Sequence, residues 1–107
     1  MKIIRTVEFA VAALLLLAGG ARAEEHKLTI KDFMFMPMAL TIAPGDTVTW
    51  VNDDGEPHTV VSLDGTFRSQ ALDENDHFTH AFSQAGTFRY LCSIHPRMVG
   101  TITVKAP

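Results

Sequence analysis

Several features that mark large protein classes are scarce or missing in this sequence. Cys92 is the only cysteine in 107 residues, so a disulfide within the chain is excluded. The longest apolar run, residues 9–18, is well short of the roughly 20 residues that cross a bilayer, so we expect no membrane span. No stretch of helical periodicity is long enough to predict a helical domain.

Basic side chains are also few. Residues 24–107 contain six Lys and Arg and eleven Asp and Glu, a formal net charge of −5. Binding to a phosphate backbone requires a basic face, so we expect no nucleic-acid partner. A negative net charge instead favours a partner with a basic docking face.

The N-terminal segment has the layout of a secretory signal peptide. Lys2 and Arg5 precede the apolar run, and Ala21-Arg22-Ala23 resembles a cleavage site with small residues. We therefore predict a signal peptide at residues 1–23, cleavage after Ala23, and one exported domain at residues 24–107 in the periplasm. In an exported protein a single cysteine forms an intermolecular bridge, remains an exposed thiol, or binds a metal.

The predicted domain is all-β. Short segments with β-branched residues or period-two alternation are separated by turn residues such as Pro44-Gly45-Asp46 and Asp64-Gly65. The predicted strands are residues 26–31, 39–43, 47–52, 58–62, 77–83, 87–92 and 99–105, with a loop at residues 67–76. Seven or eight such strands predict a β-sandwich of two sheets closed over one core.

Potential metal ligands are concentrated between the last two predicted strands. Cys92, His95 and Met98 fall within seven residues, so one tight loop can turn all three toward a common point. His58, which opens a predicted strand after a turn, is the candidate fourth ligand. Two His, one Cys and a weak axial Met is the ligand set of a blue-copper site, whereas Zn²⁺ disfavours a thioether.

An ordinary structural interpretation of these residues exists. Cys92 could be a small buried hydrophobe, Met98 a core filler and His95 a surface residue, because free Cys and Met are often used in that way. That interpretation must explain each spacing and His58 separately, so the sequence favours copper.

The ligand loop and its surroundings resemble the cupredoxins, which are small exported blue-copper proteins. The pattern Cys-x2-His-x2-Met resembles the amicyanin-like members with the shortest loop, and plastocyanin and pseudoazurin are further relatives. The matching segments are Phe35-x-Pro37, Leu40-Thr41-Ile42, Gly45-Asp46-Thr47-Val48-Thr49-Trp50-Val51-Asn52, Pro57-His58-Thr59-Val60, Gly86-Thr87-Phe88-Arg89-Tyr90-x-Cys92 and His95-Pro96-x-Met98-x-Gly100.

The resemblance implies a Greek-key sandwich with one type 1 copper ion held by His58, Cys92, His95 and Met98. It further implies a one-electron carrier between redox proteins, such as a dehydrogenase and a c-type cytochrome, and no catalysis on a small substrate. We expect a monomer.

One supporting role follows from the same resemblance, and a second follows from the expected exposure of one edge of the His95 ring, around which an apolar docking patch is expected. Asn52, at a strand end, is expected to tie the His58 strand to the Cys92 loop through the side chain of Ser93, although Asn52 could instead satisfy only its own turn. Pro57, Pro96 and Arg97 are candidate partner-docking residues. Amicyanins tend to carry an aromatic residue where Arg97 stands, and a charged residue there changes specificity more than affinity.

Met34, Met36 and Met38 leave a second function open. Three thioethers in five residues could bind Cu(I), as expected of a protein for copper delivery, storage or tolerance. The alternative, which we favour, is that Phe35 and one or two of these methionines pack the core. Among the remaining histidines, His80 shares its strand face with Phe78 and Phe82, while His77 and His26 are expected to be solvated.

Overall fold

The described part of the chain, residues 22–107 of a computed structural model, is all-β and contains no helix. The predicted signal peptide lies outside it except for its last two residues. Within residues 22–107, then, no helix is long and apolar enough to cross a membrane. The strands are β1 (Glu25–Lys31), β2 (Met34–Met36), β3 (Ala39–Ile42), β4 (Thr47–Asn52), β5 (Val61–Ser62), β6 (His77–Ala81), β7 (Gly86–Leu91) and β8 (Val99–Val104).

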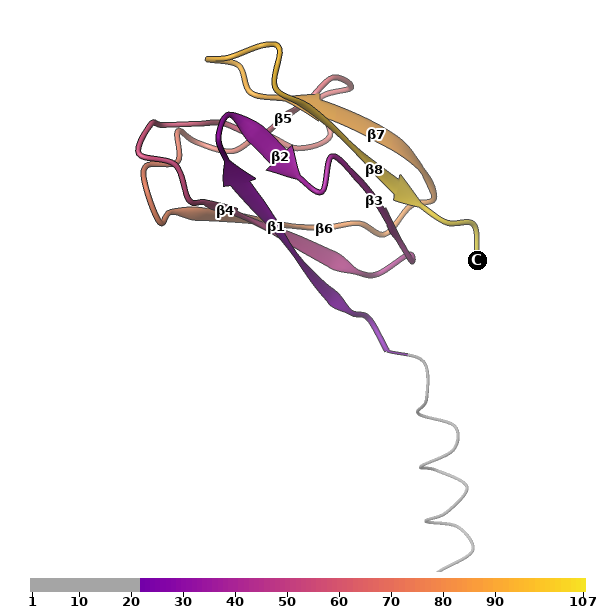
Figure 1. The fold of residues 1–107 in the computed structure, drawn as a ribbon. Helices are drawn as coiled ribbons and strands as arrows, with labels where there is room; N and C mark the ends of the chain where they lie inside the picture. Colours follow the sequence, from indigo (N-terminus) through magenta and orange to yellow (C-terminus); the bar gives the residue numbers. More distant parts are fainter. Residues whose placement is uncertain (1–21) are drawn as a thin grey trace, which may run out of the picture.

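Two four-stranded sheets make up the fold (Figure 1). Their strand orders are β2-β1-β4-β6 and β3-β8-β7-β5. The β1–β4 and β3–β8 pairs are parallel and the others antiparallel. The predicted β-sandwich is therefore confirmed.

The sequence pattern predicts most strands closely, with two differences. The residues of β2, Met34–Met36, lack the β-branched character of a typical strand, so this strand was missed. The strand expected at residues 58–62 is reduced to Val61–Ser62. His58 forms only an isolated bridge with Leu72, and Thr59 and Val60 lie outside any strand.

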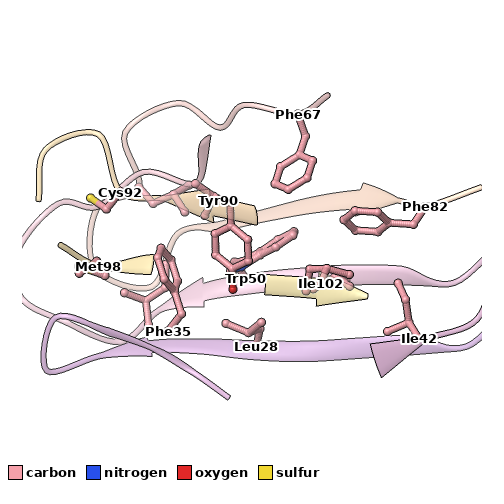
Figure 2. Packing of buried hydrophobic residues seen from close by; sticks show 14 of the residues in the cluster. Leu28, Phe35, Ile42, Trp50, Phe67, Phe82, Tyr90, Cys92, Met98 and Ile102 are labelled. Atoms are coloured by element: carbon pink, nitrogen blue, oxygen red, sulfur yellow. The ribbon is translucent and has the colours of Figure 1, made fainter. Parts of the chain in front are cut away.

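Period-two alternation builds the core. Val48 and Trp50 of β4 are fully buried, while their neighbours on the opposite face of the strand are only partly buried. Trp50 contacts Tyr90 edge to face, with ring centroids 5.4 Å apart. Figure 2 shows Cys92 and Met98 at one end of this core and Ile42 and Phe82 toward the other.

Asp46 anchors the start of β1. Its buried carboxylate accepts hydrogen bonds from the N–H groups of Glu24 (2.9 Å) and Ala43 (3.0 Å). His26 Nε2 lies 2.9 Å from the same carboxylate, and its side chain is 21% exposed, so His26 is only partly solvated. These hydrogen bonds hold the pKa of Asp46 at about 2, and the bond from the Glu24 N–H is the largest cause.

Candidate metal centre

Three of the predicted ligands converge at one end of the sandwich. The ligand atoms of His58, Cys92 and His95 all lie within 4.8 Å of one another. Cys92 Sγ is 3.8 Å from His58 Nδ1 and 3.8 Å from His95 Nδ1. His58 and Cys92 are fully buried, whereas His95 is partly exposed.

Two hydrogen bonds close the loop that carries the other ligands. The Cys92 N–H donates to the Met98 carbonyl (3.1 Å), and the Met98 N–H donates to the His95 carbonyl (2.9 Å). The loop therefore follows β7 and returns directly into β8. Met98 is 5% exposed and lies at the same end of the core as Cys92 (Figure 2).

Thr59, which directly follows His58, joins the two ligand segments. Its N–H donates to Cys92 Sγ (3.3 Å), and its hydroxyl accepts a hydrogen bond from the Ser93 N–H (2.7 Å). The Thr59 and Ser93 hydroxyl oxygens are 2.8 Å apart. Thr59 was not among the predicted site residues; the only signal for it in the sequence is a hydroxyl side chain next to a candidate ligand histidine.

The thiol of Cys92 is strongly acidified. Burial raises its pKa, but the hydrogen bond from the Thr59 N–H, followed by the contacts with the His58 and His95 rings, more than offsets burial and lowers the pKa to about 6. The thiolate, which is the form that binds metals, therefore predominates at neutral pH.

Asn52 shapes the turn that leads to His58 rather than bonding to Ser93. Its side-chain amide donates to the carbonyls of Glu56 (2.9 Å) and Leu72 (2.8 Å), and its oxygen accepts from the Asp54 N–H (2.9 Å). The predicted Asn52–Ser93 link is thus wrong, because Ser93 is hydrogen-bonded to Thr59 instead. Asn52 holds the turn through its own side chain.

Asp54 lies in that turn and contacts a candidate ligand. Its Oδ2 is 2.8 Å from His58 Nε2. Burial raises the pKa of Asp54, but the hydrogen bonds from the Phe33 and Asp32 N–H groups and from His58 more than offset it, so the pKa is below its usual value. Asp54 was not among the predicted site residues, because a position four residues before His58 in a turn does not by itself indicate a contact with the ring.

An apolar surface surrounds the partly exposed His95. The ring of Phe33 contacts the rings of His58 and His95 edge to face, at centroid distances of 5.1 and 4.8 Å. A shallow depression beside it is lined by Phe33, Ile94, His95, Pro96, Arg97 and Met98. The predicted docking residues Pro57, Pro96 and Arg97 are all exposed, and Phe33 and Ile94 are additions that the sequence analysis missed.

The donor set fits copper. An acidified thiolate and two imidazoles whose Nδ1 atoms face it, with a buried thioether in the same loop, match the His₂Cys set with a weak axial Met. The second group of close metal-binding side chains, Glu24, His26 and Asp46, has no sulfur donor, and Asp46 already accepts hydrogen bonds from its neighbours.

Comparisons with known proteins agree with this geometry. The family model of the cupredoxin-like domain matches residues 6–104. Amicyanin of Paracoccus versutus is 29% identical, over 82% of this chain and 70% of that protein. Plastocyanin of Scenedesmus fuscus is 36% identical, over 67% of this chain and 87% of its own length.

A solved structure, the purple cupredoxin from Nitrosopumilus maritimus, superimposes with a TM-score of 0.70 at 35% identity. It covers 75% of this chain and 99% of that one. The protein belongs to the cupredoxin-like family, with amicyanins and plastocyanins among its relatives. Its cofactor is one type 1 copper ion.

Proposed function

We propose that this protein is a periplasmic one-electron carrier whose copper ion is bound by four side chains: His58, Cys92, His95 and Met98. The observation that carries the proposal is the convergence of one thiolate and two imidazoles within 4.8 Å. Bound there, copper supplies a Cu(II)/Cu(I) couple.

The protein would contribute a preorganised ligand set. Hydrogen bonds that join Thr59 to Cys92 and Ser93, and others within the Cys92–Met98 loop, fix the ligand segments relative to one another. A site whose ligands are held in place by neighbouring groups moves little when its charge changes, and such a site favours fast electron transfer over catalysis on a small substrate.

His95 would be the route for the electron. It is the only one of these four side chains that is not buried, and it is adjacent to Phe33, Ile94 and Pro96. An apolar rim around a partly exposed ligand suits transient docking of a redox protein such as a dehydrogenase or a c-type cytochrome. Arg97 at this rim would adjust partner choice and association rate.

Voltammetry in the presence of a Cu(I) chelator tests electron transfer. The copper-loaded protein should give a reversible one-electron wave and keep its copper over repeated cycles. Loss of copper to the chelator on the first reduction would contradict a carrier.

N-terminal sequencing of protein from the periplasmic fraction tests export, and the sequence should begin at Glu24. Intact protein found only in the cytoplasm would contradict the proposed periplasmic location.

The exposure of three methionines favours copper delivery as a second candidate function. Phe35 is fully buried, as expected, but Met34, Met36 and Met38 are 45%, 47% and 56% exposed, so the expectation that some of them pack the core is wrong. Thioethers at the surface are available to Cu(I). Replacing all three by Leu, which keeps the apolar character, should lower Cu(I) transfer to an acceptor only if delivery is the function.

A further inference from the structure

Asp54 presents a buried carboxylate to three N–H groups from two separate segments. Oδ1 accepts from the Asp32 N–H (2.7 Å), and Oδ2 accepts from the Phe33 N–H (3.0 Å). Oδ2 is also 2.8 Å from His58 Nε2. The carboxylate therefore connects the turn between β1 and β2 with a copper ligand.

The contact with His58 determines which ring nitrogen carries the proton. An ionised carboxylate only accepts hydrogen bonds, so Nε2 must be the donor. Nδ1, which faces Cys92 Sγ at 3.8 Å, is then free to bind a metal. A carboxylate paired with a ligand histidine in this way fixes the tautomer and raises the basicity of the ring.

The backbone contacts determine where Phe33 lies. Asp32 and Phe33 both have left-handed backbone conformations, with φ of 53° and 58°, which are uncommon for residues other than glycine. Their two successive N–H groups form a concave site for an anion, and the Asp54 carboxylate occupies it. Phe33 consequently contacts the rings of both His58 and His95.

We propose that Asp54 is a positioning residue of the copper site. It holds His58 in its metal-binding tautomer and fixes Phe33 against both histidine ligands, so that copper affinity and reduction potential depend on its carboxylate. The inference rests on the proposed ligation by His58, and it adds a role for a residue and for a turn that the ligand set does not include.

The substitution Asp54→Asn tests both parts. An amide has one oxygen and one NH₂ group, so it cannot accept hydrogen bonds from all three N–H groups. If the NH₂ group faces Nε2, the ring must place its proton on Nδ1, the tautomer that cannot bind the metal. An amide in place of a buried carboxylate beside an imidazole has this effect on tautomers in serine proteases.

Asp53→Asn is the matched control. Asp53 is the neighbour of Asp54 in the sequence and its side chain is exposed, so the substitution removes the same formal charge without changing a buried contact. We expect ¹⁵N NMR of the copper-free protein at pH 8 to show the His58 proton on Nε2 in the wild type and in Asp53→Asn. The Nε2-protonated population should be smaller in Asp54→Asn, because an amide oxygen accepts a hydrogen bond more weakly than a carboxylate and an amide NH₂ group accepts none. In the same samples, amide exchange at Asp32 and Phe33 should speed up only in Asp54→Asn.

With copper added, Asp54→Asn should weaken Cu(II) binding relative to Cu(I) by about tenfold or more, because a nearby negative charge favours the higher oxidation state. A tenfold change is equivalent to a rise in reduction potential of about 59 mV. Equal potentials, tautomers and amide exchange in the two variants would overturn the proposal.

If Asp54→Asn does not fold, a measurement on the wild-type protein still tests the proposal. A His58 proton on Nδ1 in the copper-free wild type would overturn the proposal without any variant, whereas a proton on Nε2 would support it. Because this measurement uses no copper, its failure is distinguishable from a failure of the proposed electron-carrier function, which would appear only in the redox behaviour of the loaded protein.

Discussion

At the residue scale, the sequence predicts the donor side chains that come together at the end of the sandwich better than the residues that hold them. Cys92, His95 and Met98 could be predicted because their donor atoms belong to one short loop, and His58 because its residue type completes the set. Thr59 and Asp54 could not, because their contacts depend on how the turn at residues 53–57 folds back on the site. The same turn explains why the predicted Asn52–Ser93 bond is wrong.

The acidity of Cys92 gives a prediction at this scale. The pKa of its thiol is lowered from 9.0 to about 6 in the folded protein, so the native state releases a proton that the unfolded state keeps. This contribution to stability is fully present above about pH 9 and is lost as the pH falls through 6. The free energy of unfolding of the copper-free protein should therefore rise between pH 6 and 9.

Ultraviolet absorption of the thiolate against pH should give a midpoint near 6 in the copper-free protein. The variant Cys92→Ser is the control, since it should lack both the titration and the part of the stability rise that the thiolate causes. A thiol that titrates near 9 would contradict the hydrogen bonds assigned to Cys92.

At the element scale, the pairing of β7 with β8 places the Tyr90 ring over Gly100. The same pairing brings the Cys92–Met98 loop to one end of the sandwich. Strands β4, β7 and β8 could be predicted from alternation because each buries one face. Strand β2 could not, because Met34–Met36 carries only unbranched and aromatic side chains and is defined by its pairing with β1.

The β7–β8 ladder pairs Tyr90 with Gly100, and a Cβ added at Gly100 would overlap the Tyr90 ring. Gly100→Ala should lower the free energy of unfolding by about 1–3 kcal/mol, the usual cost of overpacking a core. Gly55→Ala is the matched control, because a Cβ there meets no atom within 4 Å. Urea denaturation of both variants measures the difference; equal stabilities would contradict the close packing of Tyr90 on Gly100.

The anchor of β1 gives a prediction at low pH. Asp46 has its pKa lowered to about 2 in the folded state from an ordinary value of 3.8, so its stabilising contribution is present above about pH 4 and is lost as the pH falls through 2. The variant Asp46→Asn should show a smaller loss of stability between pH 4 and 2 than the wild type. Parallel acid-unfolding curves would show that Asp46 does not act as this anchor.

At the scale of the whole molecule, one small sandwich must hold both a core and a metal site. The buried cluster that contains Trp50 and Tyr90 also contains Cys92 and Met98, so these two candidate ligands are an extension of the core (Figure 2). The all-β class and the two-sheet architecture could be predicted from period-two alternation. The order of strands within each sheet could not, because it depends on contacts between segments distant in the sequence.

Copper should therefore stabilise the whole domain. A ligand that binds only the native state adds about 4 kcal/mol at a free concentration 1,000 times its Kd. Thermal unfolding should show a higher Tm with copper than after its removal by a chelator, and Cys92→Ala should show a much smaller increase. A Tm that does not respond to copper would contradict a native-state site.

The most direct test of the central claim is the visible absorption and EPR spectrum of the Cu(II)-loaded protein, with Cys92→Ala measured alongside. We predict an intense charge-transfer band from the Cys92 thiolate and a narrow copper hyperfine splitting, both lost in the variant. A colourless or weakly coloured protein that still binds Cu(I) would contradict the type 1 site and would make copper delivery through Met34, Met36 and Met38 the better account.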